Sequence, residues 1–336
     1  MISQTIVYHS RPRVRAAAAI VGQKEGLGPY GQDFDEVLTD DLLGKDTFEQ
    51  AESELSRRTI ALCLEKAGQT EQALEALLCG DLLNQIAASG FAGRQLGAPF
   101  LGLYGACSTM IEALLLGGVL VDGGYRRHAV CSASSHWCAA ERQFRFPLEL
   151  GNQRPPSAQW TATAAGALML DSDPKPSLAR LTHATIGRVI DYEIMDANHM
   201  GAAMAPAVAD TLRAHMDDTG RTQRDYDLII TGDLGTIGRA LLLELLKQRG
   251  VPVPGEKLID CGATLYDPSQ DVHAGGSGCG CIASVLAAHF VPQLAQGTIK
   301  RILTLGSGAM LSPTTTQQGE SIPSISYAAV LEADET

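Results

Sequence analysis

The sequence lacks several features that would assign it to a specialised class of protein. Its eight cysteines form no Cys-x-x-Cys pair and follow no regular spacing, which argues against a disulfide framework and against a paired-cysteine metal site. Its longest apolar runs, such as ALLLGGVLV at 113–121, are too short to span a bilayer, and no apolar signal segment stands at the N-terminus. We therefore expect a soluble chain with reduced thiols, no secretion signal of its own, no metal and no other cofactor.

Positive charge is also scarce, because 26 Lys and Arg stand against 38 Asp and Glu, a net charge of −12 at pH 7. A chain this acidic repels nucleic acid and anionic lipid headgroups at long range, so we expect no nucleic-acid partner. Any anionic ligand must then be held by a local group of Arg, Lys or helix N-termini. The 45% of hydrophobic and 19% of charged residues are typical of a folded globular chain.

The most informative feature that is present is an internal duplication. Two pairs of segments share the same order of residue types: TEQALEALLCGDLLNQ (70–85) with TQRDYDLIITGDLGTI (222–237), and residues 108–130 with residues 281–304. The connector SDPKPS at 172–177 contains two prolines and separates a first half, 1–174, from a second half, 175–336. In each half the predicted strands alternate with helices, which predicts parallel sheets with helical crossovers.

The helices that follow Cys107 and Cys281 are apolar on nearly every face, and such helices must be buried all round. The first carries Ile111, Ala113, Leu114, Leu115 and Leu116. Two stacked sheets that share a central helical layer would cover both helices. The sequence therefore predicts an α/β protein with a duplicated five-layer α-β-α-β-α fold. Two independent flavodoxin-like domains are the alternative, but they would leave the central helices half exposed.

A single cysteine stands where a strand turns into a helix, in GLYGACSTMIEALL at 102–115. Unpaired N–H groups and the dipole at a helix N-terminus favour a thiolate, which is the form that attacks an acyl carbonyl. Cys107 would then be a nucleophile. A free cysteine between small residues is equally often a buried packing residue. The local string leaves both interpretations open.

The duplicated plan, with a cysteine at the head of the first central helix, resembles the thiolase superfamily over almost the whole chain. More narrowly, six segments are similar to the stage V sporulation protein AD family of endospore-forming bacteria: GDLLNQ (80–85), GACSTMIEA (105–113), ASSHWCAAERQFRFP (133–147), DLIITGDLG (227–235), AGGSGCGC (274–281) and GAMLSPT (308–314). This resemblance implies a protein that binds dipicolinic acid or its calcium chelate. It further implies a place at the forespore inner membrane, where stage V membrane subunits load the chelate into the spore.

The resemblance also carries expectations about catalysis and assembly. Condensing enzymes of the superfamily have a His and two Asn at the positions of Gly232, Gly235 and Gly276. His273 stands in a shortened version of the thiolase histidine motif that lacks its proline. We therefore interpret Cys107 as a vestigial, pocket-lining residue. The alternative is a condensing enzyme or acyltransferase with coenzyme A or acyl carrier protein substrates and Cys107 as nucleophile. Relatives in the superfamily pair through a strand of the first half, so we expect a homodimer, with RRHAVCSA (126–133) as the candidate edge strand.

Ligand specificity is expected from SASSHWCAAERQFRF at 132–146. Arg142 and Arg145 stand at i and i+3 on one helical face, close enough to share one carboxylate, with Arg142 preferred. The alternative is that Glu141 pairs with Arg145 on a solvated face. The backbone N–H groups at the helix N-terminus would hold the second carboxylate. The full candidate ligand-binding set is Cys107, Ser108, Ser134, Ser135, His136, Arg142, Arg145, Asp233 and Gly276.

Overall fold

The computed structural model describes residues 3–144 and 154–334, and its main strands form two five-stranded sheets with the same internal order. The first is ordered β2-β8-β6-β4-β5 and the second β9-β14-β13-β10-β11. In both sheets the second strand runs antiparallel to the first and the third strands on either side of it, whereas the third, fourth and fifth strands run parallel to one another. Short contacts between β2 and β9, at Arg13–Arg180 and Val14–Ala179, join them into one 12-stranded network that includes β1 and β3.

The bounds of the elements are as follows. The first half contains β1 (Thr5–Val7), β2 (Arg13–Val21), α1 (Gln23–Gly26), β3 (Glu36–Val37), α2 (Phe48–Lys66), β4 (Leu77–Gly80), α3 (Ala87–Leu96), β5 (Phe100–Gly102), α4 (Thr109–Asp122), β6 (His128–Ser135), α5 (Trp137–Phe144), β7 (Trp160–Thr161) and β8 (Ala164–Asp171). The second contains β9 (Ala179–Thr185), α7 (Met200–Thr219), β10 (Leu228–Thr231), α8 (Gly235–Gln248), β11 (Leu258–Asp260), α9 (Cys261–Thr264), β12 (Gly276–Ser277), α10 (Cys279–Val285), α11 (Val291–Ala295), β13 (Arg301–Ala309), α12 (Pro313–Gln317) and β14 (Ser324–Glu332).

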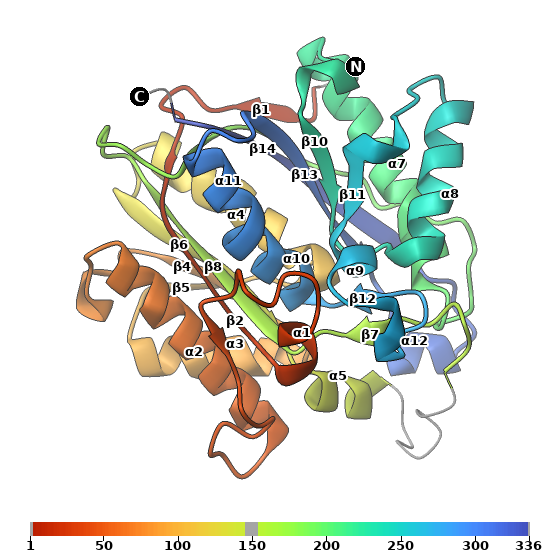
Figure 1. Ribbon diagram of the computed structural model, residues 1–336, viewed down its shortest axis with the longest axis horizontal. Coiled ribbons are helices and arrows are strands. Elements are labelled where there is room, and N and C mark those ends of the chain that lie inside the picture. The colour runs from red at the N-terminus through yellow and green to blue at the C-terminus, as the bar shows by residue number, and fades with distance from the viewer. Residues whose placement is uncertain (1–2, 145–153, 335–336) are drawn as a thin grey trace.

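The two sheets enclose a central layer of helices. Helix α4 packs on β4, β6 and β8 of the first sheet and on β13 and β14 of the second, while α10 packs on β2, β6 and β8. The outer faces are covered by α2 and α3 on one side and by α7 and α8 on the other (Figure 1). The predicted five-layer α-β-α-β-α fold is therefore confirmed.

Burial of the central helices follows the expectation from their composition. Every residue of α10 is buried, and in α4 the side chains of Ile111, Ala113, Leu114 and Leu115 are buried as well. Leu116 is the exception, because 36% of its surface remains exposed. The alternative of two separate flavodoxin-like domains does not fit, since α4 fills the space between both sheets.

The strand predicted to be a free edge is in fact internal. β6 carries most of RRHAVCSA, pairs with β4 on one side and β8 on the other, and is buried along its whole length. The prediction that this run forms the edge is wrong, because a strand whose small and apolar residues are buried on both faces belongs in the middle of a sheet. The first sheet instead ends at β5, which pairs with β4 alone among the described strands.

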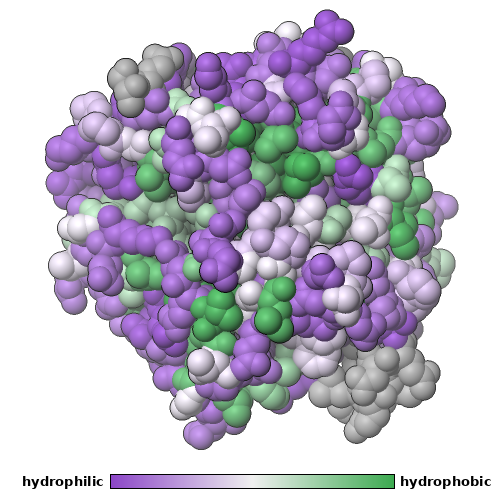
Figure 2. All heavy atoms as spheres, in the orientation of Figure 1, coloured by the Kyte–Doolittle hydropathy of each residue, from purple (hydrophilic) through white to green (hydrophobic). Residues whose placement is uncertain are grey.

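The surface is largely hydrophilic, with hydrophobic residues in small separate patches on the face shown in Figure 2. Within residues 3–144 and 154–334, no helix combines the length and apolar character needed to cross a membrane.

Candidate functional site

A tight turn places Cys107 between the first sheet and the head of α4. Ala106 adopts a left-handed conformation with φ of 50°, and a short 3-10 turn at Ala106–Ser108 leads directly into the helix. The Thr109 hydroxyl donates to the Ala106 carbonyl at 2.7 Å and accepts from the Gly105 N–H at 3.1 Å. Gly308 of β13 lets the turn sit against the second sheet, since a Cβ there would lie 2.2 Å from the Gly105 carbonyl oxygen.

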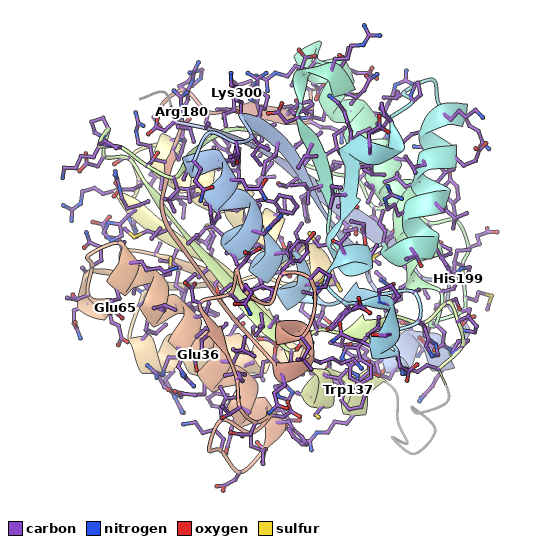
Figure 3. The ribbon with its side chains drawn as sticks, viewed as in Figure 1. Glu36, Glu65, Trp137, Arg180, His199 and Lys300 are labelled. Carbon is purple, nitrogen blue, oxygen red and sulfur yellow. The ribbon has the colours of Figure 1, made fainter. Side chains whose placement is uncertain are left out.

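Cys107 lines a cavity of about 190 Å³ that is built from both halves of the chain. Its walls come from the Cys107 turn, α5, β7, the loop before α7, β12 and the end of β13. The apolar lining is Leu82, Ala106, Ala140, Phe144, Ala197, Met200, Ala309 and Leu311, and the polar lining is Tyr104, Cys107, Glu141, Thr161, Asn198 and Ser277. Helix α5 is held against β7 by Trp137 (labelled in Figure 3), whose ring stacks on Trp160 at 4.6 Å. The cavity therefore has a mixed lining suited to a small molecule with polar groups.

The thiol at the base of this cavity is held in its neutral form. Burial raises the pKa of the Cys107 thiol well above its usual range, and the nearby Asp233 and Cys279 raise this pKa further. The sulfur lies 3.9 Å from the Ser277 hydroxyl oxygen. The helix N-terminus favours a thiolate, but burial has the larger effect on this thiol, because desolvation of the charged form outweighs the helix dipole.

Asp233 is the buried carboxyl group next to this thiol. It accepts a hydrogen bond from the Ser307 hydroxyl at 2.9 Å and a longer one from the Gly278 N–H at 3.5 Å, and it interacts with the Cys107 thiol. Burial raises the pKa of Asp233 to about 7. Asp233 supports the base of the cavity, although it does not itself line the cavity wall.

Four of the other predicted site residues are buried away from the cavity wall. The hydroxyl of Ser108 donates to Gly105 at 2.6 Å, that of Ser134 to Glu52 at 3.2 Å, and that of Ser135 to Ala162 at 2.6 Å. The His136 ring is hydrogen-bonded to the Asp41 carbonyl at 2.8 Å. These side chains bond other protein groups and do not line the cavity, so the prediction that they contact the ligand is not supported by their positions.

The arginine preferred for the carboxylate also lies elsewhere. Arg142 forms a two-pronged ion pair with Glu49 of α2, with its Nε 2.7 Å from Oε1, and it does not line the cavity. The prediction that Arg142 holds a ligand in the Cys107 cavity is wrong, because residues one position apart on α5 face different ways: Glu141 lines the cavity while Arg142 points to α2. Arg145, the second choice, lies outside the described residues.

Two of the three glycines at superfamily catalytic positions, Gly235 and Gly276, are tightly packed. A Cβ at Gly235 would lie 2.4 Å from the Ala274 carbonyl oxygen, and one at Gly276 would lie 2.8 Å from the Tyr266 ring. A side chain at Gly232 would meet only ordinary contacts, the nearest at 3.5 Å. His273 is exposed, and its ring is hydrogen-bonded to the Pro155 carbonyl at 2.8 Å, outside the Cys107 cavity.

Comparison with known proteins places this architecture in a family. The family model for stage V sporulation protein AD matches residues 2–332. The chain belongs to this family. A member of it, stage V sporulation protein AD of Bacillus subtilis (strain 168), is 42% identical over 329 residues, which cover 98% of this chain and 96% of the relative. Membership in the stage V sporulation protein AD family assigns the chain a role in sporulation.

Solved structures similar to this chain are enzymes of the thiolase type. Human mitochondrial 3-ketoacyl-CoA thiolase in complex with CoA matches with a TM-score of 0.60 and 13% identity, over 99% of this chain and all of that one. OleA of Xanthomonas campestris matches with a TM-score of 0.62 and 14% identity, over 97% of this chain and 98% of that one. 3-Oxoacyl-[acyl-carrier-protein] synthase III of Aquifex aeolicus matches with a TM-score of 0.55 and 11% identity, over 96% of this chain and 99% of that one. At such low identity these matches establish the thiolase-like fold alone.

Several polar residues of the cavity have no clear signal in the sequence. Thr161, Asn198 and Ser277 come from three separate segments, which the fold brings to one wall. Ser277 stands in AGGSGCGC, one of the segments that resemble the family, whereas Asn198 stands in an irregular loop without a recognisable pattern. The alternative of a solvated face does not hold for Glu141, which is 4% exposed and accepts a hydrogen bond from the Thr161 hydroxyl at 3.0 Å.

We predict that in Asp233→Asn the free energy of unfolding decreases less with rising pH than it does in the parent. The pKa of Asp233 is raised to about 7 in the folded state, whereas an unfolded aspartate has a pKa of about 3.9. Between these values the folded state keeps a proton that the unfolded state has released, so stability falls as the pH rises from about 4 to about 7. Asparagine cannot ionise, so the variant does not lose the free energy of unfolding, on the order of a few kcal/mol, that the parent loses over this pH range. Urea unfolding at about pH 5 and about pH 8 measures the difference.

The exposed residue Asp46 offers a matched control, and Asp46→Asn should follow the parent at both pH values. Glu25, whose pKa burial also raises to about 7, contributes equally to parent and variants and cancels in the comparison. If the free energy of unfolding of Asp233→Asn changes with pH as steeply as that of the parent, the assignment of a protonated Asp233 is wrong.

Proposed function

We propose that this chain is a non-catalytic protein that binds dipicolinic acid or its calcium chelate in the Cys107 cavity. The observation that carries the proposal is the burial of the thiol, because a nucleophile needs a thiolate, and here burial and Asp233 both raise the thiol pKa. The packed turns at Gly235 and Gly276 add support, because they leave no room for the amide side chains of condensing enzymes. Family membership supports the sporulation context.

The charge of the cavity favours the calcium chelate over the free dianion. Among the lining residues that the structure describes, Glu141 is charged and none is Lys or Arg. Calcium neutralises the dicarboxylate and prefers further oxygen ligands, which Glu141, Thr161 and Asn198 offer. The calcium here is cargo that arrives with the ligand.

We further propose that the protein hands its ligand to stage V membrane subunits at the forespore inner membrane. Its net charge of −12 opposes direct attachment to anionic lipids, so contact through protein partners is favoured.

The first prediction concerns chemistry at Cys107. Purified protein incubated with radiolabelled acyl-coenzyme A and acyl carrier protein thioesters should show neither turnover nor a stable acyl adduct above Cys107→Ala. A protonated, buried thiol is a poor nucleophile. Sustained condensation that Cys107→Ala abolishes would establish the competing function, an acyl-thioester condensing enzyme.

The second prediction concerns the ligand. Asn198→Trp places a large ring in the cavity from its loop and should weaken binding of calcium dipicolinate by more than tenfold, as measured by calorimetry. Met195→Trp is the matched control, because Met195 lies in the same loop, is 59% exposed and does not line the cavity. Isomeric pyridine dicarboxylates should bind the parent more weakly than calcium dipicolinate does. If Asn198→Trp and the parent bind calcium dipicolinate with equal affinity, the ligand does not bind in this cavity.

The third prediction concerns assembly. We propose a homodimer that forms through β5, whose outer edge is free of described strands and carries Leu101 at 47% exposure. An unpaired edge is a liability that a second copy removes. Light scattering at micromolar concentration should give a dimer for the parent and a monomer for Leu101→Lys. Leu241→Lys, at a 40% exposed position on α8, should stay dimeric. A monomeric parent would contradict the proposal.

A further inference from the structure

A second cavity, of about 370 Å³, lies in the groove between α2 and α3 on the outer face of the first sheet. We call it the α2–α3 pocket. Lys45, Glu49, Gln50 and Ser53 line it from α2 and the loop before this helix, and Phe91 and Arg94 line it from α3. Helix α2 packs over β2, β8 and β6, whereas α3 packs over β4 and β5 (Figure 1). No residue of the edge strand β5 lines the pocket.

A buried hydroxyl without a partner marks the inner wall of the α2–α3 pocket. Ser53 is only 4% exposed, and its Oγ has no hydrogen-bond partner among residues 3–144 and 154–334. Hydroxyls inside helices usually bond a carbonyl one turn back, as Thr59 of the same helix does with Leu55 at 2.9 Å. A buried polar group without a partner costs free energy, and a ligand oxygen in the pocket would satisfy it.

The pocket also has an excess of positive charge, which is unusual in so acidic a chain. Arg94 is exposed and has no carboxylate within ion-pair distance among the described residues, and Lys45 lies 3.5 Å from Glu54, a carboxylate that Arg57 already binds at 2.8 Å. The acid within the pocket, Glu49, is neutralised by its two-pronged pair with Arg142. Two cationic groups are therefore available to an anion, whereas the described lining of the Cys107 cavity has none.

An aromatic ring stands beside these cations. The Arg94 guanidinium lies over the Phe91 ring at 4.7 Å from its centroid, a cation–π contact that favours this position of the guanidinium. Phe91 remains 51% exposed, so its surface is open to the apolar part of a ligand. A guanidinium oriented in this way offers parallel donors to a carboxylate or phosphate.

We propose that the α2–α3 pocket is a second binding site, which takes a small organic anion. Its carboxylate or phosphate group lies between Lys45 and Arg94, its apolar body packs on Phe91, and one of its oxygens accepts a hydrogen bond from Ser53. The site does not depend on the function proposed for the Cys107 cavity, because no residue of that cavity lines it.

The test uses the whole chain in an Asn198→Trp background, so that the Cys107 cavity is blocked. Benzoate and phenyl phosphate supply the two anionic groups on the same aromatic body, inorganic phosphate supplies the charge alone, and benzyl alcohol supplies the body alone. Calorimetry and ligand-observed NMR should show both aromatic anions binding more tightly than inorganic phosphate or benzyl alcohol. Whichever of benzoate and phenyl phosphate binds more tightly identifies the anionic group that the site prefers.

Variants then locate the site. Lys45→Gln and Arg94→Gln should each weaken binding of the aromatic anions at least tenfold, and Ser53→Ala should weaken it several-fold. Arg58→Gln is the control, because it removes the same charge from α2 at a residue that pairs with Glu36 outside the pocket. Loss of calcium dipicolinate binding in Asn198→Trp alone concerns the Cys107 cavity and leaves this proposal unaffected. The proposal is overturned if no aromatic anion binds, or if Lys45→Gln and Arg94→Gln both bind like the parent.

Discussion

Burial of the central helices between two sheets is the constraint on which the rest of this structure depends. Helices α4 and α10 are apolar on nearly all sides and have to be covered twice, so the two halves close over them. That closure draws Cys107, at the head of α4, into the interior beside Asp233 and Cys279. In such surroundings the neutral forms of thiol and carboxyl are favoured. The same packing that builds the thiolase-like fold thereby buries its cysteine and leaves a cavity above it.

The architecture could be predicted from the sequence because it rests on patterns of many residues. The all-round apolar character of the helix after Cys107 requires cover on two sides, and the repeated order of segments predicts the same sheet twice. Errors arose where a single segment had to be placed. The run at 126–133 was predicted as an edge strand, yet its small and apolar residues fill an internal strand, β6. Strand order depends on contacts between distant segments, which one local string does not contain.

The site was harder to predict, for a related reason. The effect that favours a thiolate at Cys107, the helix N-terminus, is local, whereas the thiol pKa is decided by burial under residues more than a hundred positions away. Arg142 carries the charge that an anion needs, but the turn of α5 directs it to Glu49. Asn198 and Ser277 reach the cavity only through the closure of the two halves. Charge and spacing indicated the type of ligand contact, while the fold decided which residues can make it.

The account as a whole depends on Cys107 being a neutral cavity residue, and its ionisation can be measured directly. Alkylation of the folded protein by iodoacetamide, with Cys107 followed by mass spectrometry as the pH is varied, reports the fraction of thiolate. The account predicts slow modification at neutral pH and a rate that still increases above about pH 9, beyond the titration of an ordinary thiol. A rate that reaches its plateau below about pH 7 would show an activated thiolate and would contradict the account.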